Sequence, residues 1–152
     1  MLANLLEYLF GGTRGFNDAE SRLLSFVSES LPPEEQRIWE QQIRSVRKVQ
    51  RQIPGQLIAV YYQRNAKVPP LPYPGYEHCL ATVTYLSRGR ARTTSLVLHD
   101  GRFMTFERNV PQRLGDIEAL QSIVLHPKGF KSVAPEIDGQ EHRESGAGPH
   151  VD

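Results

Sequence analysis

Basic side chains are concentrated in the middle of this 152-residue sequence. Residues 37–92 hold ten basic and two acidic residues, whereas the whole chain has a formal net charge of +1. Guanidinium and ammonium groups bind phosphates and carboxylates, so a cluster of them predicts a surface for an anionic partner. We expect that surface to contain Arg37, Arg44, Arg47, Lys48, Arg51, Arg88, Arg90 and Arg92.

Helical spacing would bring the first five of these residues together. At about 100° per residue, residues 33–52 form an amphipathic helix whose basic side chains lie opposite an apolar face that includes Trp39. The remaining three arginines are expected on a hairpin beside this helix. An alternative interpretation is that the basic face is simply exposed to solvent, and that its ion-pair partners are the acidic side chains within residues 1–36.

A second group of reactive side chains is expected at one end of a sheet. If residues 79–86 and 93–99 are paired strands, His78 lies opposite His99, and His99 lies opposite Arg102. Two imidazoles and a guanidinium could bind a metal ion or an anion. Local spacing supplies no third metal ligand, and partly exposed histidines are common at strand ends. We therefore expect neither a metal nor another cofactor.

Cys79 is the single cysteine of the chain, so it has no partner for an internal disulfide. On the register just described, it points to the apolar face of the sheet, away from both histidines. A buried free cysteine usually behaves as a small hydrophobic side chain rather than as a nucleophile. Its solitary occurrence favours a reducing compartment, and we take the cytoplasm as the expected location.

The sequence lacks the common catalytic motifs. G-x-S-x-G, H-E-x-x-H, the phosphate-binding glycine loop and the dinucleotide-binding fingerprint are all missing. Residues 11–15 are rich in glycine and precede a predicted helix, but they follow no predicted strand, which indicates a linker. Prolines at positions 69, 70, 72 and 74 predict an extended loop. These observations favour a protein without catalytic activity.

The candidate residues must be positioned by a sheet, and its strands are visible in the sequence. Residues 79–86, 93–99 and 103–106 have β-forming composition, and residues 57–62 predict a fourth strand, placed at an edge. Asp100-Gly101 is a strong signal for a two-residue hairpin, and Arg88-Gly89 is a weaker one. The resulting register pairs Ala81 with Leu96, Val83 with Thr94, Leu98 with Phe103 and Val97 with Met104.

Helices are expected mainly before the sheet. Residues 1–10 predict a short amphipathic helix, and residues 17–31 predict a second one that begins with a capping box of Asn17 and Glu20. Residues 33–52 are the third. Residues 116–125 predict a short final helix, although residues 122–125 are also compatible with a strand.

Together these elements predict an α+β fold, with N-terminal helices packed on one face of a four-stranded antiparallel β-meander that spans residues 57–108. We expect residues 1–133 to form one domain and residues 134–152, which are polar and rich in glycine and proline, to be a disordered tail. No run of about 18 apolar residues predicts a transmembrane helix.

Three functional hypotheses follow. The first is a non-catalytic module that binds an acidic protein partner through the basic helix face and the arginine-rich hairpin. The second is binding of a nucleic-acid backbone, RNA in particular, through the same surface. The third is a ligand-binding or enzymatic domain that uses the sheet face carrying both polar and apolar residues. His78, His99 and Arg102 would lie at one end of that face. The sequence does not determine the oligomeric state.

Overall fold

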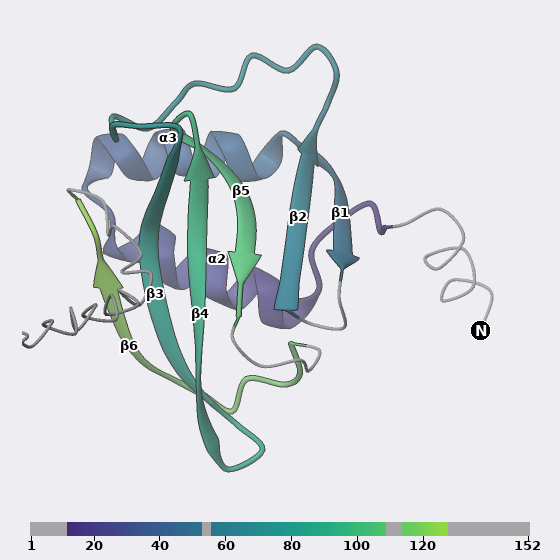
Figure 1. Cartoon of the computed structure of the whole chain (residues 1–152), viewed down its shortest axis with the longest axis vertical. Coiled ribbons are helices and arrows are strands. Elements are labelled where there is room, and N and C mark those ends of the chain that lie inside the picture. The colour runs from purple at the N-terminus through teal and green to yellow at the C-terminus, as the bar shows by residue number, and fades with distance from the viewer. Residues whose placement is uncertain (1–11, 53–55, 109–113, 128–152) are drawn as a thin grey trace, which may run out of the picture.

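The computed structural model describes residues 12–52, 56–108 and 114–127, which form two helices and one six-stranded antiparallel sheet (Figure 1). The predicted α+β class is confirmed, and the sheet is two strands wider than expected. The predicted helix at residues 1–10 and the predicted tail at residues 134–152 lie outside the described residues. The elements are α2 (Asp18–Ser30), α3 (Pro33–Arg44), β1 (Val46–Gln52), β2 (Leu57–Tyr62), β3 (Glu77–Ser87), β4 (Arg90–His99), β5 (Arg102–Glu107) and β6 (Ala119–Leu125).

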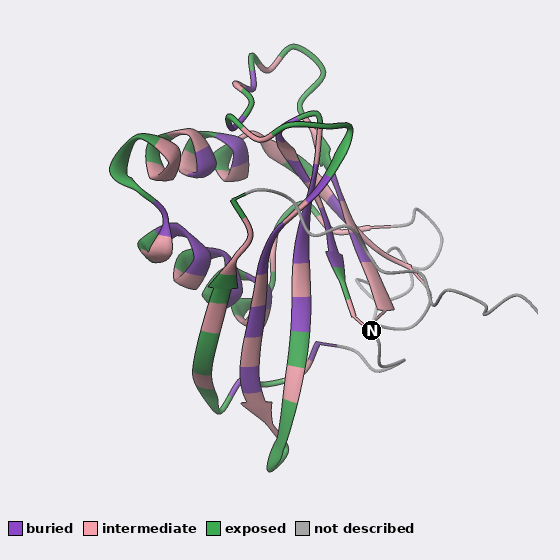
Figure 2. Ribbon diagram, turned by 60° about the vertical axis from the view of Figure 1, so that its left-hand side comes forward, coloured by how far each residue is buried: buried purple, intermediate pink, exposed green. Residues whose placement is uncertain are grey.

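The strands are ordered β1-β2-β5-β4-β3-β6, and both helices pack on the same face (Figures 1 and 2). This face carries the apolar residues predicted for it, including Val83, Tyr85, Leu96 and Phe103, which are buried. No helix among the described residues is long and apolar enough to cross a membrane.

The start of α2 agrees with its sequence signal. The Asn17 side chain accepts a hydrogen bond from the backbone N–H of Glu20 at 2.8 Å, and the Glu20 carboxylate accepts one from the N–H of Asn17 at 2.9 Å. This reciprocal pair satisfies two backbone donors that have no partner within the helix. The helix ends at Ser30, and Leu31 is already extended before Pro32.

The predicted helix at residues 33–52 is wrong in its second half, because α3 ends at Arg44 and the chain continues as β1. The N–H of Ser45 approaches the carbonyls of Gln41 and Gln42, which completes the last helical turn. Beyond it, β1 pairs with β2 on one side, while Val49 exchanges two 2.8 Å hydrogen bonds with Thr13 on the other. These non-local bonds outweigh the helical periodicity of the segment.

The predicted helix at residues 116–125 is also wrong. Residues Ala119–Leu125 form β6, which pairs with β3 and places Ile123 opposite Val83 on the buried face. The strand alternative at residues 122–125 is therefore the one that occurs. Because β1 lies outside β2, the strand at Leu57–Tyr62 is not the edge that we expected.

Both predicted hairpins are present. Asp100 and Gly101 have φ angles of 48° and 73°, and Arg88 and Gly89 have 51° and 67°, as type I′ turns require. The pairs Leu98–Phe103, Ala81–Leu96 and Val83–Thr94 follow the predicted register.

Two β-bulges, which the sequence does not signal, alter the rest of the register. In one, Met104 of β5 is the extra residue between the pairs Val97–Thr105 and Leu98–Phe103, so Val97 pairs with Thr105 rather than with Met104. The other lies between Cys79 and Ala81, so Glu77 rather than His78 is opposite His99. A bulge adds one residue to a strand and reverses the facing of every residue beyond it. His78 therefore lies on the helix-covered face and Cys79 on the other, the reverse of our expectation.

Candidate binding surface

The eight basic residues proposed from the sequence do not form one surface. Arg37 and Arg44 are on α3, whereas Arg47, Lys48 and Arg51 are on β1. The three hairpin arginines, Arg88, Arg90 and Arg92, lie at the far end of the sheet from α3 (Figure 1).

The length of β4 indicates how far the hairpin arginines lie from α3. The strand runs from Arg90 to His99, which corresponds to about 30 Å at the usual rise per residue. Helix α3 contacts the His99 end, where Gln42 Nε2 donates to the carbonyl of Gly101 at 2.9 Å. The hairpin and the helix therefore cannot contact the same small feature of a partner.

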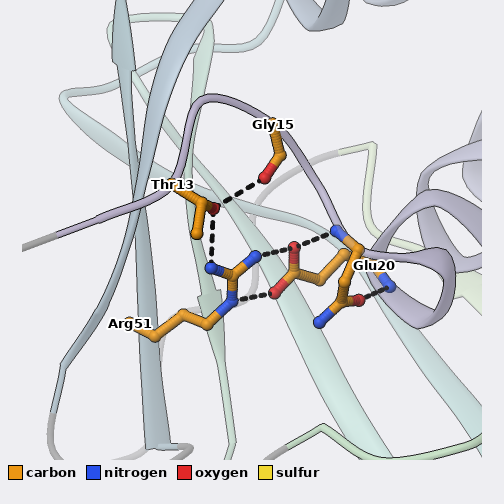
Figure 3. Close-up of polar contacts among 5 residues, drawn as sticks. Thr13, Gly15, Glu20 and Arg51 are labelled. Carbon is orange, nitrogen blue, oxygen red and sulfur yellow. Dashed lines mark hydrogen bonds and ion pairs between the residues drawn. The ribbon is translucent and has the colours of Figure 1, made fainter. Parts of the chain in front are cut away.

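Arg51 is engaged inside the domain rather than on a binding face (Figure 3). Its Nε and Nη2 donate to the two carboxylate oxygens of Glu20 at 2.7 and 2.8 Å, and Nη1 donates to Thr13 Oγ1 at 2.8 Å. The Glu20 side chain is 0% exposed and that of Arg51 is 21% exposed. This network joins the segment before α2, the helix itself and β1, so we assign Arg51 a structural role.

Two arginines of α3 form ion pairs along the helix surface. Arg37 pairs with Glu34 one turn earlier, and Arg44 Nη1 lies 3.7 Å from Glu40 Oε2. Arg37, Glu34 and Arg44 are largely exposed, and the Glu40 side chain is 45% exposed. Exposed pairs of this kind contribute only about 0–1 kcal/mol, so a partner could displace them at little cost.

Positive charge does converge at one corner of the fold, where α3 ends, β1 begins and β2 ends. The N–H of Gln63 donates to the carbonyl of Ser45 at 3.1 Å, and Gln41 Nε2 donates to the carbonyl of Lys67 at 3.4 Å. These contacts hold the chain after β2 against the α3–β1 junction. The cationic residues on these segments form what we call the basic corner: Arg44, Arg47, Lys48, Arg64 and Lys67.

Within the described residues, the charge of the basic corner is mostly uncompensated. Arg47, Arg64 and Lys67 are exposed, and none of them forms an ion pair with an acidic side chain in the part of the chain that the structure describes. Among the five members, only Arg44 has such a pair, with Glu40. A group of cations without internal partners attracts anions from solution.

An aromatic ring adjoins this corner on the open face of the sheet. The Lys48 ammonium lies 5.6 Å from the centre of the Tyr61 ring, and the Tyr61 hydroxyl donates to Gln50 Oε1 at 2.8 Å. Tyr61 is 43% exposed, one of three large hydrophobic residues that are this accessible among those described. The corner therefore combines cations with one accessible aromatic surface.

Arg64 and Lys67 were missed as site residues at the sequence level. Both were counted in the basic stretch, but they follow β2 in a loop and belong to neither a helix face nor a hairpin. Their position depends on the hydrogen bonds of Gln63 and Gln41 to residues about twenty positions away. No local spacing signals such contacts.

The hairpin arginines are placed less favourably for a partner. Arg88 and Arg90 are exposed, but the Glu118 carboxylate accepts hydrogen bonds from the N–H of Gly89 at 3.2 and 3.3 Å. An acidic side chain is thus built into the turn itself. Arg92 is partly buried.

The predicted His78, His99 and Arg102 group does not form a site. His78 is buried and its ring stacks on Tyr73 with 4.7 Å between the ring centres, whereas His99 stacks on Tyr76 and approaches Glu77 at 3.7 Å. Arg102 Nε donates to the carbonyl of Val68 at 2.8 Å. No three histidine, cysteine, aspartate or glutamate side chains of the described residues are arranged to hold a metal ion.

Cys79 lies on the sheet face opposite the helices and is half-buried. Its Sγ approaches the carbonyl of Ala81 at 3.7 Å. Burial raises the pKa of the Cys79 thiol, and the nearby Thr82 and Ser95 hydroxyls oppose this shift only in part. A thiol that stays protonated is a poor nucleophile, which argues against a reactive role for Cys79.

A shallow groove of about 350 Å³ separates α2 from α3. Trp39 and Leu24 are among the residues that line it, and Ser28 Oγ and Gln36 Nε2 both donate to Glu40 Oε1 at its side. These polar groups satisfy one another. The Glu40 carboxylate is therefore engaged within the domain.

Comparisons with models of protein families, with curated proteins and with solved structures found no match to this chain. The basic corner is therefore the feature of this chain from which a function can be inferred.

Proposed function

We propose that this domain is a non-catalytic interaction module that binds an acidic protein partner through the basic corner. The observation that carries the proposal is the grouping of Arg47, Arg64 and Lys67, exposed and without acidic partners among the described residues. Complementary charge raises the association rate and selects against partners of like charge. Single-cysteine composition is consistent with a cytoplasmic location, which we include in the proposal.

This proposal changes the surface expected from the sequence. Arg44, Arg47 and Lys48 remain in it, and Arg64 and Lys67 join them. Arg51 leaves it because its guanidinium is bound to Glu20. Arg88 and Arg90 are excluded from the proposed surface because their hairpin is distant from the basic corner. Arg92 and Arg37 are not required for binding.

The second candidate is a nucleic-acid backbone, and one specific observation favours it. The exposed Tyr61 ring beside Lys48 resembles the aromatic and cationic pairs on which single-stranded nucleic acids stack. Phosphate binding releases condensed counterions, so affinity for RNA would fall steeply as salt is raised. Tyr61 would then contribute through stacking, which an acidic protein does not require.

Fluorescence anisotropy with two labelled probes separates these candidates. The probes are a poly-L-glutamate peptide, which represents an acidic protein, and an oligouridylate of equal charge. We expect the peptide to bind the full chain, and the double variant Arg47→Glu, Arg64→Glu to weaken it by at least tenfold. Preferential binding of oligouridylate that is lost on Tyr61→Ala would select the second candidate. Binding of neither probe at low salt would contradict both.

A further inference from the structure

The two edges of the sheet are protected to very different extents. At the β1 edge, Val49 exchanges hydrogen bonds with Thr13, and Arg47 and Lys48 place charge along the strand. Covering segments and charged side chains are the usual means by which an edge strand avoids pairing with another chain. The β1 edge is thus closed to further strands.

Among the described residues, nothing gives the opposite edge, β6, either kind of protection. Within the described residues it pairs only with β3, and Figure 1 shows it as the last strand of the sheet. Its seven residues, ALQSIVL, include no charge and no proline. Val124 is 53% exposed. An uncharged edge strand with two adjacent β-branched residues, Ile123 and Val124, is a template for strand addition.

The hydrogen bonds of β6 show which backbone groups face outward. The N–H of His126 donates to the carbonyl of Leu80 at 2.9 Å, and Val124 pairs with Thr82 in the same register. Backbone groups alternate in direction along an antiparallel strand. The N–H and C=O groups of Ile123 and Leu125 therefore point away from β3, toward the open side.

We propose that a second copy of this chain binds here, with the two β6 strands antiparallel about a two-fold axis at Val124. In this register Ile123 lies opposite Leu125 of the second copy on the helix-covered face, and the two Val124 side chains meet on the open face. Apolar residues thus face apolar residues on both sides of the joined sheet. The absence of charge removes the repulsion that identical charged strands would experience, which favours a second copy over a charged partner.

The proposed dimer has twelve strands and leaves both β1 edges at its two ends. Each basic corner therefore stays accessible, and the inference does not depend on what that corner binds. About this axis only Ile123, Val124 and Leu125 of each β6 pair with one another, and Ser122 lies opposite His126 of the second copy. This short contact buries little area, so the dimer should be weak and depend on concentration.

Sedimentation equilibrium tests the association. We expect the apparent mass of the full chain to rise from 17.2 kDa at low concentration toward twice that value at high concentration. Val124→Lys places two ammonium groups across the axis and should abolish this rise. The matched control, Thr93→Lys, introduces the same charge on an exposed residue of β4 and should dimerise as the wild type does.

Cysteine cross-linking tests the register in a Cys79→Ser background. Directly opposite residues at a non-hydrogen-bonded position have Cα atoms about 4.5 Å apart, which permits a disulfide, so Val124→Cys should cross-link on mild oxidation. Ser122→Cys is the control, because its two copies would be displaced by about 13 Å along the strands. A monomer at all concentrations, an unchanged dimer of Val124→Lys, or equal cross-linking at both positions would overturn the proposal.

Discussion

Arg51 and Glu20 form a two-point ion pair, at 2.7 and 2.8 Å, in which the carboxylate is completely buried. The pair joins the first turn of α2 to β1, whose residues the sequence predicts as part of a helix. Glu20 also caps α2 through Asn17. One carboxylate thus determines where a helix begins and where the neighbouring strand lies.

Loss of this pair should destabilise the domain. Arg51→Ala leaves the Glu20 carboxylate buried without its cation, and breaking a buried pair in this way costs about 3–5 kcal/mol. Arg37→Ala is the control, because it removes an exposed arginine whose pair contributes little. Urea unfolding measures both changes. If Arg51→Ala were no more destabilising than Arg37→Ala, the ion pair would not have the structural role assigned to it.

Trp39 should report on the packing of α3 against the sheet. The side chain is 1% exposed, its ring lies 5.1 Å from that of Phe103, and Nε1–H donates to the carbonyl of Leu24 at 3.2 Å. We expect blue-shifted native fluorescence that moves to the red on unfolding. Trp39→Ala should lower the free energy of unfolding by about 3–5 kcal/mol. Native emission as red as that in denaturant would contradict the observed packing.

Gln42 is a buried polar residue whose amide ties α3 to two loops. Nε2 donates to the carbonyls of Pro69 at 2.7 Å and Gly101 at 2.9 Å, and Oε1 accepts from the N–H of Phe103 at 2.9 Å. Gln42→Met keeps the volume and removes the amide from the Pro69 carbonyl and the Phe103 N–H, at about 1–3 kcal/mol for each group that stays unsatisfied. The Gly101 carbonyl still accepts from the N–H of Leu71 at 2.8 Å. Thermal unfolding should show a clear loss of stability, whereas Gln63→Met, at an exposed position, should change it little.

The strand core and both hairpins were predictable because their signals are local. Asp100-Gly101 and Arg88-Gly89 adopt the positive φ angles that their composition favours, and the apolar alternation around them gives the buried face. Residues 46–52 were not predictable in the same way. Their apolar residues fit a helical period, and the partners that make them a strand, Thr13 and β2, are distant in sequence.

The candidate site was recovered only in part for a related reason. Residues Arg44, Arg47 and Lys48 were identified from charge alone. Arg51 was assigned to the same surface because a helical wheel cannot show that Glu20 neutralises it. The β-bulge after Cys79 moved His78 away from His99, and a one-residue insertion of this kind has no composition signal.

The raised pKa of Cys79 predicts slow thiol chemistry. Burial favours the protonated thiol in the folded chain, so the thiolate fraction at neutral pH is below that of a free cysteine, which titrates near pH ~8.5. Reaction with a disulfide reagent should therefore be slower than for glutathione at pH 7. The rate should increase as pH rises or as urea unfolds the chain. A native rate above that of glutathione would contradict the shift.

Capture of partners by two matched variants tests the central claim most directly. Arg47→Glu, Arg64→Glu reverses two charges at the basic corner, and Arg88→Glu, Arg90→Glu reverses two charges at the hairpin, so both change the net charge equally. Immobilised full-length chains are incubated with ribonuclease-treated lysate, with circular dichroism as the check of folding. Our account predicts that the acidic proteins retained by the wild type are also retained by the hairpin variant and are lost from the corner variant. Equal retention by the two variants, or loss from the hairpin variant alone, would contradict it.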